Sequence, residues 1–373
     1  MSEQTKYMRV KSEVKKWLIE GKVLPGEKIH SESQLVDIFK VSRHTIRQAI
    51  GELVNEGWLY RERGAGTFCA YRLDNEVTPV SKKGKMIGVI TTYLSDYIFP
   101  SIIRGIESHL TEQGYSMIVA STNNDVELEK QCLEMMMVQN VDGLIIEPTK
   151  SSNYNPNLNY YLTLEQKNIP YVMINQFYRE LNPPHIMVDD EKGGYLSTSH
   201  LLKLGHINII GIFKVDDLQG MARMKGFIRA FREQGLSFLP HTLLTYTTEN
   251  KKEVIRSEIQ TILQSGERPT GIVCYNDEVA MDVLQILRKL EINVPADMSI
   301  VSHDNSYLSE TSEIKLTSVT HPKAKLGEDA AKWIVSRIKS NHVSVQEIVY
   351  NPDLIIRTST KKYNDVISPS KEE

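Results

Sequence analysis

Polar side chains follow the apolar runs of this sequence at positions where parallel strands would end. Glu147 follows the run GLII, Asn175 follows YVMI, and Asp304 follows MSIVSH. Asn276 follows GIVCY, and Arg223 lies in the segment after INIIGIF. Because the carboxyl ends of parallel strands meet at one edge of a sheet, these groups can converge on one cleft. Carboxylates, amides and a guanidinium beside aromatic rings suit an uncharged ligand that is rich in hydroxyl groups.

Each of these residues has an ordinary structural alternative, because Asp and Asn often cap helices at strand-to-helix turns. A catalytic alternative has less support, since the sequence has no GxSxG elbow, no P-loop and no HExxH motif. A sugar kinase or an aldolase would need a phosphate loop or a catalytic Lys–carboxylate pair. We therefore predict a binding protein and not an enzyme, with no cofactor and no metal site.

A second set of polar side chains lies near the N-terminus, on one face of a predicted helix over residues 42–57. Its apolar stripe comprises Ile46, Ala49, Ile50 and Leu53. At about 100° per residue, His44 and Gln48 lie opposite the stripe, and Thr45 and Arg47 flank them. Arg can read guanine, Gln can read adenine, and Thr can reach a phosphate or a thymine methyl group. This face is a candidate for reading DNA in the major groove, and an ordinary solvated face is the alternative.

The neighbouring elements favour the DNA-reading interpretation. A helix over residues 5–20 precedes a short helix, SESQLVDIF, whose start has capping-box spacing. Lys40 and Val41 make a tight turn into the reading helix, as in a helix-turn-helix. The segment WLYRERGAGTFCAYR then predicts a hairpin that carries Arg61 and Arg63. Its GAGTF is too short for GxGxxG and joins two strands, so nucleotide binding is not expected there.

Charge divides the 373 residues into a basic and an acidic part. Residues 1–85 carry 16 Lys and Arg against 11 Asp and Glu, a net charge of +5, and residues 86–373 carry 28 against 36, a net charge of −8. We predict a DNA-binding domain over 1–70, a Pro-, Gly- and charge-rich linker over 71–85, and a second domain over 86–373. No signal peptide and no apolar run of about 20 residues occurs, so we expect a cytoplasmic protein without a membrane span.

The second domain alternates short apolar runs with helical segments from Met86 onward, which indicates an α/β domain with parallel sheets covered on both faces. After MSIVSH we expect a longer irregular stretch. The three cysteines lie far apart, with no CxxC pair, and are expected to be buried apolar residues.

The motif order over residues 5–70, including VSRHTIRQAIGELVNEGWLYRERGAGTF, resembles the winged-helix head of the GntR family. This resemblance implies sequence-specific binding of operator DNA. The positions that it carries over as DNA contacts are Lys6, Glu32, Ser33, Arg43, His44, Thr45, Arg47, Gln48, Arg63 and Gly64.

The segments HLLKLGHINIIGIF, YNDEVAMDVLQ and VPADMSIVSHDN are similar to the effector domain of the lactose/galactose repressor family. This implies the two-lobed periplasmic sugar-binding fold. The ligand contacts that the resemblance implies are Asp96, Tyr97, Phe99, Glu147, Asn175, Arg223, Asn276 and Asp304. The chain departs from that family in two ways. Its linker lacks the family's hinge helix, which puts in doubt release by hinge ordering, and Asn305 replaces the second Asp of the family's pair.

The combination of the two domains resembles the arabinose repressors of Gram-positive bacteria, over roughly residues 5–360. It implies a homodimeric repressor that binds a palindromic operator in double-stranded DNA and is released by L-arabinose. The same architecture responding to another sugar or to a nucleoside is the alternative.

Overall fold

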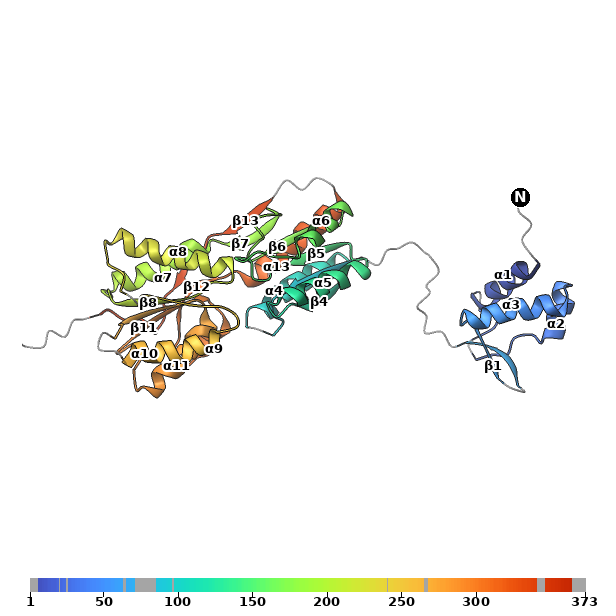
Figure 1. The fold of residues 1–373 in the computed structure, drawn as a ribbon, viewed down its shortest axis with the longest axis horizontal. Coiled ribbons are helices and arrows are strands. Elements are labelled where there is room, and N and C mark those ends of the chain that lie inside the picture. Colours follow the sequence, from blue (N-terminus) through green and yellow to red (C-terminus); the bar gives the residue numbers. More distant parts are fainter. Residues whose placement is uncertain are drawn as a thin grey trace, which may run out of the picture. The chain divides into compact units, whose positions relative to one another are not determined.

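A computed structural model describes residues 6–19, 21–24, 26–62, 65–70, 85–95, 97–239, 241–264, 268–340 and 346–363. The predicted site residues Arg63, Gly64 and Asp96, and the predicted linker up to residue 84, lie outside these ranges. The chain divides into two compact units, Met1–Lys83 and Gly84–Glu373 (Figure 1). No helix within the described ranges is both long enough and apolar enough to cross a membrane.

The first unit consists of three helices followed by an antiparallel hairpin. Its elements are α1 (Lys6–Ile19), α2 (Glu32–Phe39), α3 (Arg43–Asn55), β1 (Leu59–Glu62) and β2 (Gly66–Cys69). Ser31 and Gln34 form the predicted capping box at the start of α2. Lys40 ends α2 in a left-handed conformation (φ 52°), which turns the chain into α3. The predicted apolar stripe of α3 is buried in the core, so the winged helix-turn-helix prediction is confirmed.

The N-terminal lobe of the second unit is built on a six-stranded parallel sheet with the order β13-β7-β6-β5-β3-β4. Its strands are β3 (Met86–Thr91), β4 (Ser116–Ser121), β5 (Gly143–Ile146), β6 (Tyr171–Ile174), β7 (His185–Val188) and β13 (Glu347–Tyr350). Helices α4 (Phe99–Glu112) and α13 (Lys323–Lys339) pack on one face. Helices α5 (Val126–Val138) and α6 (Leu158–Gln166) pack on the other.

The C-terminal lobe has a second six-stranded sheet with the order β14-β12-β11-β10-β8-β9, in which only the β12–β14 pair is antiparallel. Its strands are β8 (Ile209–Lys214), β9 (Leu243–Tyr246), β10 (Gly271–Cys274), β11 (Ser299–Asp304), β12 (Thr317–Thr320) and β14 (Leu354–Ile355). Its helical segments are α7 (Asp190–Lys203), α8 (Leu218–Glu233), α9 (Lys251–Glu253), the π-helical η1 (Val254–Glu258), α10 (Ile259–Gln264), α11 (Asp277–Lys289) and α12 (Tyr307–Thr311). The predicted α/β fold with parallel sheets is confirmed.

Helices α7 and α8 approach so closely that glycine is required where they touch. A Cβ atom on Gly194 would lie 2.0 Å from the carbonyl oxygen of Arg223, and one on Gly226 would lie 2.0 Å from that of Glu191. The two helices therefore pack backbone against backbone. This contact fixes the position from which α8 presents the Arg223 side chain.

The prediction of an irregular stretch after residue 304 is wrong. That stretch contains α12, β12, the 17-residue α13, β13 and β14. The strand β12, TSVT, is buried but largely polar, and its hydroxyl groups are paired inside the lobe. Ser318 Oγ, for example, donates to Asp277 Oδ1 (2.7 Å). A polar buried strand lacks the apolar run by which a strand is recognised in a sequence. The three cysteines are free and buried, as predicted.

Candidate functional site

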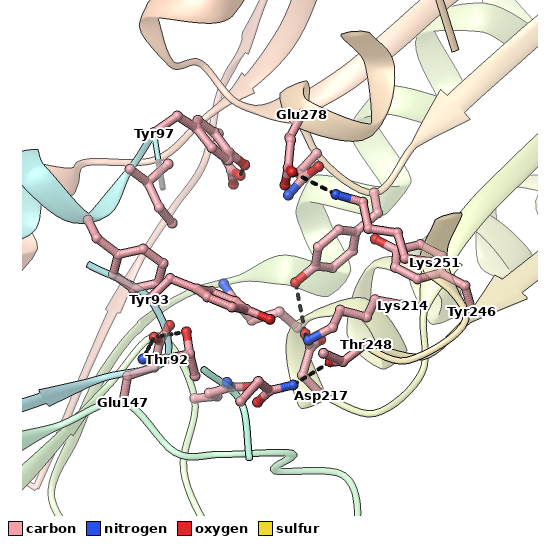
Figure 2. Close-up of a pocket in the computed structure, with 18 of the residues that line it drawn as sticks. Thr92, Tyr93, Tyr97, Glu147, Lys214, Asp217, Tyr246, Thr248, Lys251 and Glu278 are labelled. Atoms are coloured by element: carbon pink, nitrogen blue, oxygen red, sulfur yellow. Dashed lines mark hydrogen bonds and ion pairs between the residues drawn. The ribbon is translucent and has the colours of Figure 1, made fainter. Parts of the chain in front are cut away.

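A cavity of about 270 Å³ lies between the two lobes of the second unit, at the carboxyl ends of their strands. Figure 2 shows the side chains around it, with Tyr97, Tyr93 and Glu147 on one side and Lys214 and Tyr246 on the other. The sequence-predicted residues that line the cavity are Tyr97, Phe99, Glu147, Arg223, Asn276 and Asp304. Residues that are more than 200 positions apart in the chain, such as Tyr97 and Asp304, therefore meet at one place.

Arg223 lies in the cavity wall, is only 3% exposed and donates hydrogen bonds from all three of its guanidinium nitrogens. Its Nε donates to Asp190 Oδ1 (2.7 Å), its Nη1 to the carbonyl oxygen of Tyr275 (2.7 Å), and its Nη2 to Asp304 Oδ1 (3.2 Å). The guanidinium carbon also lies 4.9 Å from the centroid of the Tyr275 ring. One buried cation is thus shared by two buried carboxylates.

The two carboxylates respond differently to this shared cation. Burial raises the pKa of Asp190 to about 6, although Arg223 opposes the rise. Burial also acts to raise the pKa of Asp304, but Arg223 outweighs it and the pKa is lowered. Tyr97 donates from its hydroxyl group to Asp304 Oδ2, and burial raises the pKa of Tyr97 well above its usual value. Asp304 therefore presents an ionised carboxylate at the cavity.

Asp304 also has a backbone conformation that a non-glycine residue rarely adopts (φ 92°). Its neighbour Asn305 has a positive φ of 41°, and Asn175 at the end of β6 has one of 64°. Such strain persists only where surrounding contacts hold it, and it is concentrated at ligand sites. Here the contacts of Asp304 with Tyr97 and Arg223 hold its side chain at the cavity wall.

Glu147 is buried on the N-terminal lobe's side of the cavity and accepts hydrogen bonds on both carboxylate oxygens. Thr92 donates to Oε2 from its backbone N (3.0 Å) and its Oγ1 (2.5 Å). Asn175 Nδ2 donates to Oε1 (2.8 Å), and His321 Nε2 donates in turn to Asn175 Oδ1 (3.0 Å). Burial raises the pKa of Glu147, and the donors from Thr92 and Asn175 oppose that rise.

Asn175 itself is fully buried and is not part of the cavity wall. The placement thus does not support the prediction that Asn175 contacts the ligand directly. Its side chain instead orients Glu147, which does line the cavity. Asn276, by contrast, lies on the wall and uses its Oδ1 to accept from the backbone N of Val279 (2.9 Å), which caps α11.

The sequence prediction missed several residues of the wall, among them Thr92, Tyr93, Lys214, Asp217, Gln219 and Tyr246. Lys214, at the end of β8, lies 3.0 Å from Asp217 Oδ2 and 3.4 Å from Asp216 Oδ1. The Tyr275 hydroxyl donates to Asp217 Oδ2 (2.9 Å), and Asp217 Oδ1 caps α8. The KVDD segment follows the strand INIIGIF directly, so the strand-end rule could have found Lys214 and Asp217.

The charges around the cavity balance. Its carboxylates are Glu147, Asp217, Glu278 and Asp304, and its cations are Lys214, Arg223, Lys251 and Lys252. Tyrosine and phenylalanine rings complete the wall. A site with no net charge, many fixed donors and acceptors, and apolar rings matches a small uncharged ligand with several hydroxyl groups.

The lobes also touch each other around the cavity. Asn124 Nδ2 from the N-terminal lobe donates to Thr248 Oγ1 of the C-terminal lobe (2.6 Å). Lys150 forms an ion pair with Glu249, and Ser152 Oγ donates to the carbonyl oxygen of Val215 (2.6 Å). The cavity is therefore bounded by direct lobe-to-lobe contacts.

The candidate DNA-reading residues of the first unit lie at the beginnings of α2 and α3. Arg43, His44, Arg47 and Gln48 are exposed, and Thr45 is half-buried. Arg47 Nε donates to Glu32 Oε2 (2.8 Å), and Arg43 Nη2 donates to Ser33 Oγ (3.0 Å). These two hydrogen bonds connect the predicted DNA contacts on α2 with those on α3. Lys6 is exposed at the start of α1.

Comparison with protein families gives a match for each unit. Residues 6–69 match the family of bacterial regulatory proteins called gntR, and residues 198–360 match a periplasmic binding protein-like domain. Among curated relatives, the arabinose metabolism transcriptional repressor of Halalkalibacterium halodurans is 53% identical, with 96% of this chain and 97% of the relative covered. The arabinose metabolism transcriptional repressor of Geobacillus stearothermophilus is 46% identical, with 97% of this chain and all of the relative covered.

Solved structures resemble the second unit. The transcription regulator CcpA of Lactococcus lactis is 26% identical with a TM-score of 0.66, covering 75% of this chain and all of that one. A LacI family transcriptional regulator from Enterococcus faecium with bound ribose is 27% identical with a TM-score of 0.65 and the same coverage. These relatives and structural neighbours are transcriptional regulators. Membership of such a repressor family implies binding of operator DNA and of a sugar effector.

Proposed function

This chain belongs to the family of arabinose metabolism transcriptional repressors, and from that premise we propose that L-arabinose is the effector that releases it from operator DNA. The proposal rests on the cavity between the lobes. There the Asp304 carboxylate, the Arg223 guanidinium and the Glu147 carboxylate face one small space beside tyrosine rings. A volume of about 270 Å³ is below the range of drug-sized ligands, as expected for a monosaccharide.

The sugar acts as an effector and undergoes no reaction. A ligand that contacts both lobes favours the arrangement in which the lobes meet, and it can shift the equilibrium only by its difference in affinity for the two arrangements. Neither a cofactor nor turnover is needed for this role.

The working form is a homodimer. A winged helix reads one half-site, so a palindromic operator requires two heads related by twofold symmetry. Operator DNA lies in the cytoplasm, which is where we expect the protein to act.

The test starts with selection of a binding site for the full chain from a pool of randomised DNA duplexes. We expect an inverted repeat, and titration of L-arabinose into the complex should release the protein. D-ribose, D-xylose, D-galactose and purine nucleosides are titrated in parallel, because a structural neighbour holds ribose. If one of these compounds released the protein and L-arabinose did not, that compound would be the effector instead of L-arabinose. Tighter binding with L-arabinose would make the sugar a corepressor.

A further inference from the structure

The wing of the first unit is wider than its two-stranded hairpin. The segment 26–29 runs antiparallel beside β2, with Lys28 paired to Phe68. Its backbone bonds join Gly26 N to the carbonyl oxygen of Cys69 (2.9 Å) and Ile29 N to that of Thr67 (3.0 Å). Cys69 N donates back to the carbonyl oxygen of Glu27 (2.9 Å). The segment therefore forms a third edge of the wing.

Lys28 lies on the outer face of this wing. Side chains alternate between the two faces of a strand, and the next residue, Ile29, is buried in the core. Lys28 shares the outer face with Phe68 and Gly66. A Cβ atom on Gly66 would lie 2.5 Å from Lys28 Cε and 3.0 Å from Lys28 Nζ. The lysine stem thus lies across Gly66, at the start of β2, and places its ammonium group beside that residue.

The Lys28 ammonium group has no partner within the described part of the chain. Some other cations of the same unit are paired: Lys11 and Lys15 lie 2.5 Å and 3.7 Å from Glu56, and Arg47 lies 2.8 Å from Glu32. A groove between the wing and α2 is lined by Lys28, Ser31, Glu32 and Gly66. Lys28 therefore stands between two elements that carry predicted DNA contacts.

We propose that Lys28 binds a phosphate of the DNA backbone beside the wing. The inference deepens the proposed repressor function and rests on it. An ammonium group is a compact point charge, which suits a phosphate oxygen, and it lacks the planar fork with which Arg reads guanine. A phosphate contact positions the head on the duplex and adds affinity without adding sequence preference.

The test compares the wild type, Lys28→Gln and Lys28→Arg in the full chain. Affinity is measured over a series of KCl concentrations, on the selected operator duplex and on a mixed-sequence duplex of the same length. We expect Lys28→Gln to reduce the slope of log affinity against log salt by about 0.9 for each bound head, on both duplexes. Its affinity deficit should shrink about threefold per head between about 50 and 200 mM salt. Lys28→Arg keeps the charge and should keep the wild-type slope.

Lys15→Gln is the matched control, because Lys15 pairs with Glu56 at the far end of α3 and its loss should leave the slope unchanged. Thermal unfolding checks that the head of each variant stays folded. A wild-type slope for Lys28→Gln, or a loss confined to the operator duplex, would overturn the phosphate contact. If the wild type failed to distinguish the two duplexes, the repressor proposal would fail, and the slope on the mixed-sequence duplex would still decide the role of Lys28.

Discussion

Arg223 shows why some residues of the cavity cannot be truncated to test sugar binding. Its guanidinium lies between Asp190 and Asp304, and all three side chains are buried. Removing one partner of a buried ion pair typically costs about 3–5 kcal/mol, because the other charge is left uncompensated. Arg223→Ala would therefore lower the stability of the unit as well as its affinity for sugar.

Asn276 offers a cleaner test, because its two amide atoms have separate tasks. Its Oδ1 caps α11, and its Nδ2 makes no hydrogen bond to the described residues and is available to a ligand. Asn276→Asp keeps the capping acceptor and replaces the donor with a carboxylate oxygen. We expect L-arabinose to bind about ten- to a hundredfold more weakly by calorimetry, the cost of about 1–3 kcal/mol for an unsatisfied buried polar group.

The control for this substitution is Asn250→Asp. The Asn250 Oδ1 also accepts a backbone hydrogen bond, from Thr247 N (2.7 Å), but Asn250 lies outside the cavity wall. The sugar affinity of the Asn250→Asp variant should therefore equal that of the wild type. Equal sugar affinity for both variants would remove Asn276 from the binding site.

Asp190 makes stability depend on pH. Its pKa is about 6 in the folded protein and 3.8 when unperturbed, so the folded state binds more protons than the unfolded chain between about pH 4 and 6. Stability should fall as the pH rises through this window, by at most about 3 kcal/mol from this residue. Asp190→Asn should remove the fall. Urea unfolding at a series of pH values measures the free energy of unfolding of the wild type and of Asp190→Asn. If both proteins lost stability in parallel as the pH rose, Asp190 would not be the group responsible. Asp304, whose pKa is lowered, acts in the opposite direction below this window.

At the scale of elements, local patterns predicted the head and the strand ends. The capping box at Ser31 and the apolar stripe of α3 depend on residues within one or two helical turns, so spacing alone reveals them. Glu147 and Asp304 could be predicted in the same way, because Glu147 directly follows the buried strand β5 and Asp304 is the last residue of the buried strand β11.

The remaining site residues depend on packing between distant segments. The end of β8 marks Lys214 and Asp217 as candidates, but a Lys with two Asp close behind it is also typical of a solvated loop. Their side chains are only 13% and 4% exposed because the start of α8 packs against the opposite lobe, where Leu218 N donates to Ser151 Oγ (2.9 Å). Asp190 looks like an ordinary residue of a helix start. Its bond to Arg223 exists only because Gly194 and Gly226 let α7 and α8 touch. No local pattern in the sequence encodes that contact.

Helix α3 carries Arg47, which is predicted to read a base of the operator. Arg47 is 64% exposed, and Glu32 holds its guanidinium beside the start of α2. Arg47→Ala should weaken operator binding by about 1–3 kcal/mol, or about one to two decades, and leave sugar affinity unchanged. Arg47→Lys keeps the charge but loses the bidentate geometry, so it should lose operator preference while keeping the salt dependence. Gel-shift titrations at several salt concentrations measure the operator affinity of each variant and its salt dependence. Wild-type operator affinity for Arg47→Ala would exclude Arg47 from the reading face.

At the scale of the whole second unit, the two lobes are also joined by contacts outside the cavity wall, made by residues that are not predicted to contact DNA. Lys150 and Glu249 form one such pair, with side chains 21% and 61% exposed. Because the pair is partly solvated, its contribution is about 1 kcal/mol or less. Because this pair joins the lobes, it stabilises the same arrangement that the sugar is proposed to stabilise.

Charge reversal of this pair therefore tests coupling without touching either ligand. Lys150→Glu and Glu249→Lys each place like charges across the lobes, and each should weaken L-arabinose binding by up to about fivefold. The double variant restores opposite charges and should recover the wild-type affinity. Since the effects of sugar and operator on each other are one free energy, the sugar concentration that releases the operator should shift by the same factor. Single effects that simply add in the double variant would show that the Lys150–Glu249 pair does not control lobe closure.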